Sequence, residues 1–170
     1  MRPLAPLAIV LLLAACGGGG GVLELTRDDG SEIDVGAHSG VWCGAEDSYS
    51  IARGQPRALH VVVGSFPPSR AQPKSYFYLT RRLSDLRRNP VVSVGEDTDF
   101  PIAYVFDSTT RNEVASNLTG ANGTVRFRDV SCRRGAEVRV LLDTVLVSEN
   151  GNGGPVHVHG DVRARVGAGE

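Results

Sequence analysis

A strict alternation near the C-terminal end constrains the fold more than any other feature of this chain. Every second residue from position 156 to position 166 is small or apolar: Val156, Val158, Gly160, Val162, Ala164 and Val166. The residues between them, from His157 to Arg165, are polar or charged. Successive side chains of a β-strand point to opposite faces of a sheet. The pattern therefore predicts a long antiparallel strand with one buried face and one face in water.

The preceding residues predict further strands of this kind. Apolar and polar residues alternate over residues 125–128, and Val138, Val140 and Leu142 would share one face of a strand. Val145 and Val147 continue the alternation on a face that is shifted by one residue. We expect a β-bulge at residues 143–144, because an extra residue in one strand produces such a shift.

Shorter apolar stretches earlier in the chain predict more strands. They lie at residues 22–35 (a hairpin), 41–43, 49–52, 59–63, 76–79, 91–94 and 102–106. Residues 60–63 are apolar enough for a strand that is buried on both faces. Trp42 is expected to lie buried beside Cys43.

One segment favours a helix, and the rest favours an all-β fold. Leu79, Leu83 and Leu86 are spaced like one face of a helix that ends before Pro90, so a short helix is expected near residues 80–88. Many short strands separated by turns predict an antiparallel β-sandwich, Ig-like or jelly-roll-like, with a barrel as the alternative.

Residues 1–15 have the build of an export signal. Arg2 precedes an apolar run over residues 7–13, which is far shorter than the ~20 residues that cross a bilayer as a helix. The run ends in Leu13-Ala14-Ala15-Cys16, which resembles the lipobox of bacterial lipoproteins. The resemblance implies cleavage before Cys16, attachment of lipid to its sulfur with fatty-acyl chains such as palmitate, and a place in the bacterial cell envelope. An ordinary cleaved signal is the alternative.

The same resemblance divides the chain into three parts. Residues 1–15 would be the lipoprotein signal peptide, residues 16–21 the lipidated cysteine with a glycine tether, and residues 22–170 a single β-sandwich domain. Gly17 is not the aspartate that the lipoprotein class uses for retention in the inner membrane, which favours the outer membrane in a Gram-negative source. The long C-terminal strands and Ser131-Cys132 are similar to those of small β-sandwich lipoproteins that have no assigned activity.

Two cysteines remain once Cys16 is assigned to lipid. Cys43 and Cys132 form an even pair in an exported chain, which predicts a disulfide. A loop of this length would stabilise the fold by about 4–5 kcal/mol in the chain-entropy model. A reactive thiol or a metal pair is the alternative, but neither a CxxC spacing nor an adjacent histidine supports it.

Charge and motifs exclude several function classes. The chain without residues 1–15 has 17 Lys and Arg against 19 Asp and Glu, a net charge of −2, whereas a nucleic-acid-binding domain is strongly basic. No G-x-S-x-G motif and no phosphate-binding GK[ST] loop is present, so no catalytic residue is assigned and a non-enzymatic role is expected.

His157, His159 and Asp161 are the candidate metal ligands. On one strand face the two histidines would lie about 6.5–7 Å apart, and two imidazoles with a carboxylate can bind zinc. His38 or His60 could add a ligand. The alternative is a solvated strand face that carries histidines without a metal. No other cofactor is expected.

Three weaker candidate sites accompany the metal hypothesis. Arg81, Arg82, Arg87 and Arg88 could lie against anionic headgroups, or could form an ordinary solvated surface near Asp85. Trp42, Tyr76 and Tyr78 could stack on sugars, as in a carbohydrate-binding module. Residues 28–29 and 96–99 could hold calcium, although ordinary turns explain them better.

The function expected from these features is that of a membrane-anchored, exported lipoprotein. Its domain would bind a partner or support an envelope assembly without catalysis. Its partners would be the membrane, through the lipid, and an envelope protein or glycan. The alternatives are a metal-binding protein or small metal-dependent enzyme, and a carbohydrate-binding module.

Overall fold

The computed structural model describes residues 21–36, 38–45, 57–64, 74–88, 90–95, 102–148 and 154–167. These residues form ten strands and one helix. The elements are β1 (Gly21–Arg27), β2 (Ser39–Ala45), β3 (Arg57–Gly64), β4 (Tyr76–Arg82), α1 (Leu83–Arg88), β5 (Val91–Ser93), β6 (Ala103–Asp107), β7 (Asn112–Ala115), β8 (Asn122–Arg128), β9 (Glu137–Leu146) and β10 (Val156–Arg165). The predicted strand at 49–52, the acidic segment 96–99 and the anchor and tether up to residue 20 lie outside the described residues.

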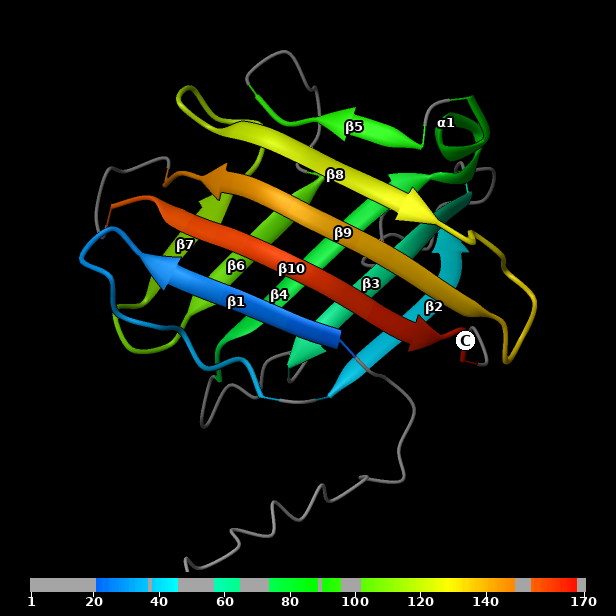
Figure 1. Ribbon diagram of the computed structural model, residues 1–170, viewed down its shortest axis with the longest axis horizontal. Helices are drawn as coiled ribbons and strands as arrows, with labels where there is room; N and C mark the ends of the chain where they lie inside the picture. The colour runs from blue at the N-terminus through cyan, green and yellow to red at the C-terminus, as the bar shows by residue number, and fades with distance from the viewer. Residues whose placement is uncertain are drawn as a thin grey trace, which may run out of the picture.

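The strands form two antiparallel sheets that face each other. Sheet A has the order β1-β10-β9-β8-β5, and sheet B has the order β2-β3-β4-β6-β7. Figure 1 shows the two layers, with the strands of sheet A crossing those of sheet B. Single bridges join the sheets at two corners, Val41 with Val166 and Ala115 with Val147. The predicted all-β, antiparallel sandwich is confirmed.

The core lies between the inner faces of the two sheets. In β10, Val156, Val158, Val162 and Ala164 are buried, and the residues between them are exposed or half-buried. Facing them across the core is sheet B, whose largest fully buried side chain is Phe77. A fully buried side chain of this size contributes about 1.5–3 kcal/mol. The alternation that predicted one dry and one wet face is confirmed.

Strand β3 is buried on both faces, as predicted. Leu59, Val61 and Val63 belong to the core cluster. Between them His60 and Val62, on the outer face, are 0% and 8% exposed.

The predicted bulge at residues 143–144 is absent. The pairing of β9 with β10 runs without interruption from Glu137 to Leu146. Thr144 and Leu146 continue the inner face, whereas Val145 lies on the outer face and is only half-buried. The prediction failed because a threonine occupies a core position while a valine beside it does not.

Three smaller expectations also need correction. The hairpin over residues 22–35 is short: its return segment forms a single bridge, Thr26 with Glu32, on one edge of β1, and the other edge of β1 pairs with β10. The helix begins at Leu83, since β4 continues to Arg82. Trp42 lies on the outer face of sheet B against His60, and not in the core beside Cys43.

Candidate functional site

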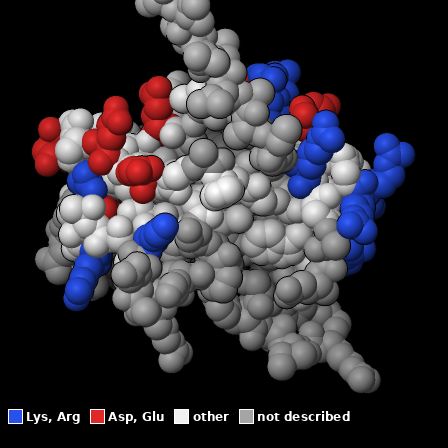
Figure 2. Space-filling view, turned by 90° about the horizontal axis from the view of Figure 1, so that it is seen from below, with Lys and Arg blue, Asp and Glu red and all other residues white. Residues whose placement is uncertain are grey.

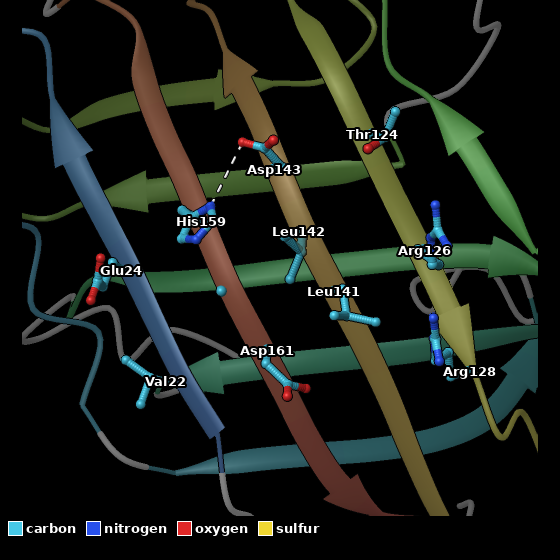
Figure 3. A pocket seen from close by; sticks show the side chains of 11 residues that line it. Val22, Glu24, Thr124, Arg126, Arg128, Leu141, Leu142, Asp143, His159 and Asp161 are labelled. Atoms are coloured by element: carbon cyan, nitrogen blue, oxygen red, sulfur yellow. Dashed lines mark ion pairs between the residues drawn. The ribbon is translucent and has the colours of Figure 1, made fainter.

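The outer face of sheet A carries a shallow pocket of about 490 Å³. Strands β1, β10, β9 and β8 supply its lining (Figure 3). Leu141 is an apolar side chain near its centre, and the charged or titratable side chains around it are Glu24, Arg126, Arg128, Asp143, His159 and Asp161. We call this the sheet A pocket. The centre of the pocket is apolar, and longer polar side chains surround it.

Strand register places these side chains in three parallel rows. The first row is Arg163, Arg139 and Arg128, on β10, β9 and β8. The second is Val22, Asp161, Leu141 and Arg126, and the third is Glu24, His159, Asp143 and Thr124. Directly opposed residues of neighbouring strands lie about 4.5–5.5 Å apart. The face of sheet A that holds the pocket is therefore basic along one row, of which Arg128 lines the pocket, and mostly acidic along another.

Asp161 is the most strongly held carboxylate of the pocket. Arg139 binds it through Nε at 2.8 and 3.0 Å and through an Nη at 2.6 Å. Arg163 adds a hydrogen bond at 3.0 Å. The hydrogen bonds from Arg139 lower the pKa of Asp161 to about 2, with a smaller contribution from Arg163 and against some desolvation. Asp161 is thus a fixed anion that anchors two guanidinium groups.

The three candidate metal ligands lie on the same face of β10, as predicted, but they do not form a set of metal ligands. The Asp161 oxygens accept hydrogen bonds from arginines. His159 is 72% exposed, and its Nδ1 lies 3.7 Å from Asp143 Oδ1; His157 is also exposed. His60 belongs to the other sheet. Within the described ranges no group of three or more His, Cys, Asp or Glu side chains could hold a metal ion.

The candidate arginine cluster lies at the end of β4 and in α1. Arg82, Arg87 and Arg88 are exposed. Arg81 is half-buried and lies 3.7 Å from Asp85, the acidic neighbour that the sequence offered. The next strand after α1 is β5, whose Val91 pairs with Arg126 of β8. The cluster therefore lies beside the basic part of the sheet A pocket.

The candidate sugar-stacking residues all lie on the outer face of sheet B. Trp42 stacks on His60 with ring centroids 5.0 Å apart. Tyr78 lies 6.0 Å from the same imidazole. Tyr76 lies between Tyr104, at 5.9 Å, and Phe106, at 5.7 Å. These rings pack against one another, so they form an aromatic cluster of the protein itself and not a row of open platforms.

His60 is the buried centre of this aromatic cluster, whereas the sequence had suggested it only as an additional metal ligand. Its Nδ1 lies 2.6 Å from the Tyr78 hydroxyl, and its Nε2 lies 2.8 Å from the Ala45 carbonyl oxygen. The period-two spacing of Tyr76 with Tyr78, and of Tyr104 with Phe106, was the signal that could have placed the cluster on one face.

The acidic turn at residues 28–29 is an ordinary turn in the structure. Asp29 accepts hydrogen bonds from the Ser31 backbone amide at 2.9 Å and from the Ser31 hydroxyl at 2.6 Å. These two bonds from Ser31 lower the pKa of Asp29. The Asp29 carboxylate therefore stabilises its own turn.

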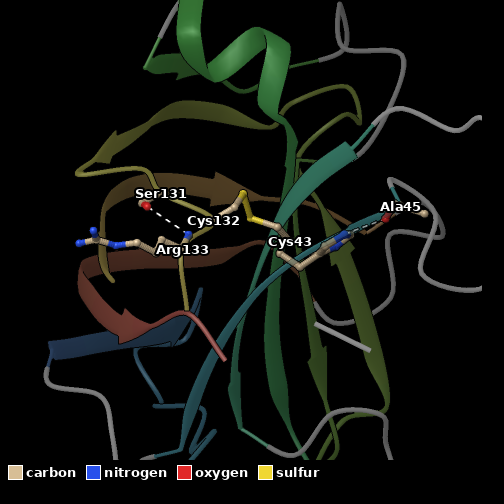
Figure 4. Close-up of a disulfide and its surroundings, with 6 residues drawn as sticks. Cys43, Ala45, Ser131, Cys132 and Arg133 are labelled. Carbon is tan, nitrogen blue, oxygen red and sulfur yellow. Dashed lines mark hydrogen bonds between the residues drawn. A yellow bond between two sulfur atoms is a disulfide. The ribbon is translucent and has the colours of Figure 1, made fainter. Parts of the chain in front are cut away.

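The predicted disulfide is confirmed. Cys43 and Cys132 are bonded, 89 residues apart in the chain (Figure 4). Cys43 belongs to β2 of sheet B, and Cys132 lies in the connection between β8 and β9 of sheet A. The bond therefore links the two layers covalently.

Comparison with known proteins identified no similar protein. No family model matches the chain, and no curated protein or solved structure compared with it gives a match. In the part of the chain that the structure describes, no helix is long and apolar enough to span a membrane.

Proposed function

We propose that this chain is an exported lipoprotein, anchored through Cys16, whose β-sandwich is a non-enzymatic binding module. The Cys43–Cys132 disulfide carries the proposal, because such bonds persist in oxidising compartments outside the cytosol. It agrees with the export signal and lipobox-like Leu13-Ala14-Ala15-Cys16 at the start of the chain.

The sheet A pocket supports a binding role. It joins an apolar centre at Leu141 to exposed guanidinium groups at Arg126 and Arg128. Its most perturbed ionisable group, Asp161, is held by Arg139 and Arg163 as a fixed anion. A carboxylate in that state orients arginines and does not exchange protons near neutral pH. The partner would be a component of the envelope with complementary charge.

Fatty-acid labelling tests the anchor. Cells that express the tagged chain are fed a clickable palmitate analogue, and the purified protein is analysed by mass spectrometry. We expect label on a peptide that begins at Cys16, and none in Cys16→Ala, whereas Gly18→Ala should label normally. A chain that carries no lipid, or that keeps its label in Cys16→Ala, would overturn the proposal.

Crosslinking in the native envelope tests the binding role. A C-terminal tag is used to recover crosslinked partners from the wild type and from Arg126→Glu/Arg128→Glu. We expect one reproducible partner that the variant loses. Zinc analysis of the same preparation separates the metal alternative: one zinc per chain, lost in His157→Ala, would replace the binding role by a metal-dependent one.

A further inference from the structure

We infer that the basic end of the sandwich docks on anionic phospholipid headgroups of the membrane that anchors the chain. The inference rests on the proposed function, because it needs the lipid at Cys16. It assigns a partner to the basic side of the sheet A pocket.

The chain enters the fold at this end. β1 begins at Gly21, which pairs with Val162 of β10, and Arg163 is the next residue of β10. Only residues 17–20 lie between Cys16 and Gly21. A glycine-rich segment of this length spans about 10–12 Å. A lipid on Cys16 therefore keeps this end of sheet A within reach of the headgroups.

Arginines line the same end of sheet A. Arg163, Arg139 and Arg128 form one row across three neighbouring strands, whose spacing is about 4.8 Å. Arg126 and Arg128 are exposed and form no ion pair among the described residues. Asp161 neutralises only part of the row, because its carboxylate is shared between Arg139 and Arg163. The exposed guanidinium groups can therefore bind phosphate oxygens.

Two neighbouring segments extend the basic surface. Arg133 and Arg134 are exposed in the connection between β8 and β9. Arg87 and Arg88 are exposed in α1, just before the strand that pairs with Arg126 of β8. The acidic residues at this end of sheet A, Asp129, Glu137 and Asp161, are fewer than the arginines.

The opposite end of the molecule carries a group of acidic side chains. Asp28, Asp29, Glu32 and Asp34 follow the far end of β1. Figure 2 shows most acidic side chains toward one end of the view, where some basic side chains also lie, and a mainly basic group toward the other end. An anionic surface attracts the basic end and repels the acidic end, so it orients the anchored domain. Val22, 67% exposed beside the point of entry, offers an apolar side chain to the interface.

Arginine footprinting tests the inference. The lipidated protein is placed in vesicles of phosphatidylcholine alone, or of phosphatidylcholine mixed with phosphatidylglycerol. Phenylglyoxal then modifies accessible guanidinium groups, and mass spectrometry measures the rate at each arginine. At about 0.1 M salt, where the screening length is about 10 Å, we expect the rates at Arg126 and Arg128 to fall about fivefold in the anionic vesicles. Arg111, at the acidic end, serves as the internal control and should not change.

A pair of matched variants separates a specific surface from net charge. Arg165, exposed at the same end of β10, should also be modified more slowly in the anionic vesicles of the wild type, and Arg126→Glu/Arg128→Glu should abolish this protection. Lys74→Glu/Arg111→Glu makes the same change in charge at the opposite end and should retain it. All four side chains are exposed, and an unchanged melting temperature shows that each variant is folded.

The outcomes are distinct. Protection that is confined to anionic vesicles and lost at about 1 M salt, where screening is nearly complete, supports the inference. Equal modification in both kinds of vesicle, by a protein shown to carry its lipid, overturns the inference and leaves the proposed function intact. A protein that carries no lipid overturns both.

Discussion

Arg27 and Asp107, 80 residues apart in the chain, form a bidentate ion pair that connects the two sheets. Arg27 Nε lies 2.7 Å from Asp107 Oδ2, and an Nη lies 3.0 Å from Oδ1. Arg27 ends β1 of sheet A, and Asp107 ends β6 of sheet B. The two side chains are 13% and 2% exposed. Thr110 and the Thr109 amide also donate to the same carboxylate.

Asp107→Asn should destabilise the fold by about 2–4 kcal/mol, because it leaves a mostly buried guanidinium without its counter-charge. Urea unfolding measures the change. Asp161→Asn is the control, since the Asp161 pair on sheet A is more exposed, and it should cost less than about 1 kcal/mol. Equal losses of unfolding free energy in the two variants would show that the ion pair between the sheets stabilises the fold no more than the exposed pair does.

The same carboxylate makes stability depend on acid. Desolvation on burial acts to raise the pKa of Asp107, but hydrogen bonds from Arg27, Thr110 and Thr109 outweigh it and lower the pKa to about 2. The unfolded chain, with an ordinary value near 3.8, takes up the proton first as pH falls. The stabilisation is therefore complete above about pH 5 and is lost progressively toward pH 2. Unfolding curves between those limits should converge for the wild type and Asp107→Asn.

Removing the disulfide should lower stability by about 4–5 kcal/mol in the chain-entropy model. The double substitution Cys43→Ala/Cys132→Ala is compared with the wild type in urea, without and with reductant. Reductant should destabilise the wild type and leave the variant unchanged. A wild type that is insensitive to reductant would contradict the bond between the two layers.

Gly160→Ala should destabilise sheet A by about 2–4 kcal/mol, because the backbone of β1 must shift to admit the new methyl group. Gly160 has φ +149°, and a Cβ at this position would collide with the carbonyl oxygen of Val22 in β1. Gly30→Ala is the matched control: it also has positive φ, +82°, but no atom lies within 4 Å of its Cβ position. Its cost should stay near the ~1–2 kcal/mol of a left-handed residue. Similar losses would contradict a close approach of β1 to β10.

Thr144→Val should stabilise the protein by about 1 kcal/mol. The Thr144 side chain is buried in the core, and its hydroxyl has no hydrogen-bond partner in the part of the chain described. Valine keeps the shape and removes the polar group. Thr124→Val, on the exposed face of β8, should change the melting temperature little. A loss of stability in Thr144→Val would show that the hydroxyl has a partner.

The sequence was most informative about features that depend on a single strand. The period-two pattern of residues 156–166 predicted which side chains of β10 are buried, and so it placed His157, His159 and Asp161 in one row. It could not show that Arg139 of the neighbouring strand holds Asp161, because that contact depends on the register between β9 and β10. The sheet A pocket was missed for the same reason.

The predictions were wrong where side chains break the usual link between polarity and exposure. Thr144 is buried and Val145 is half-buried, so the alternation seemed to shift where the strand is regular. Trp42 was expected to lie buried beside Cys43, but its outer-face position lets it stack on His60. Both errors come from packing between distant segments, which local pattern does not record.

The pairing of the first strand with the last has a consequence for the order in which the chain can mature. β1 is the first strand described and finds its neighbour in β10, whose last residue is Arg165. Until nearly the whole chain has emerged from the ribosome, β1 lacks its neighbour in sheet A and the core stays open on that side. Contacts of such long sequence separation form slowly. Sheet A therefore reaches its full width only after the last strand has been made, however early the other strands have paired.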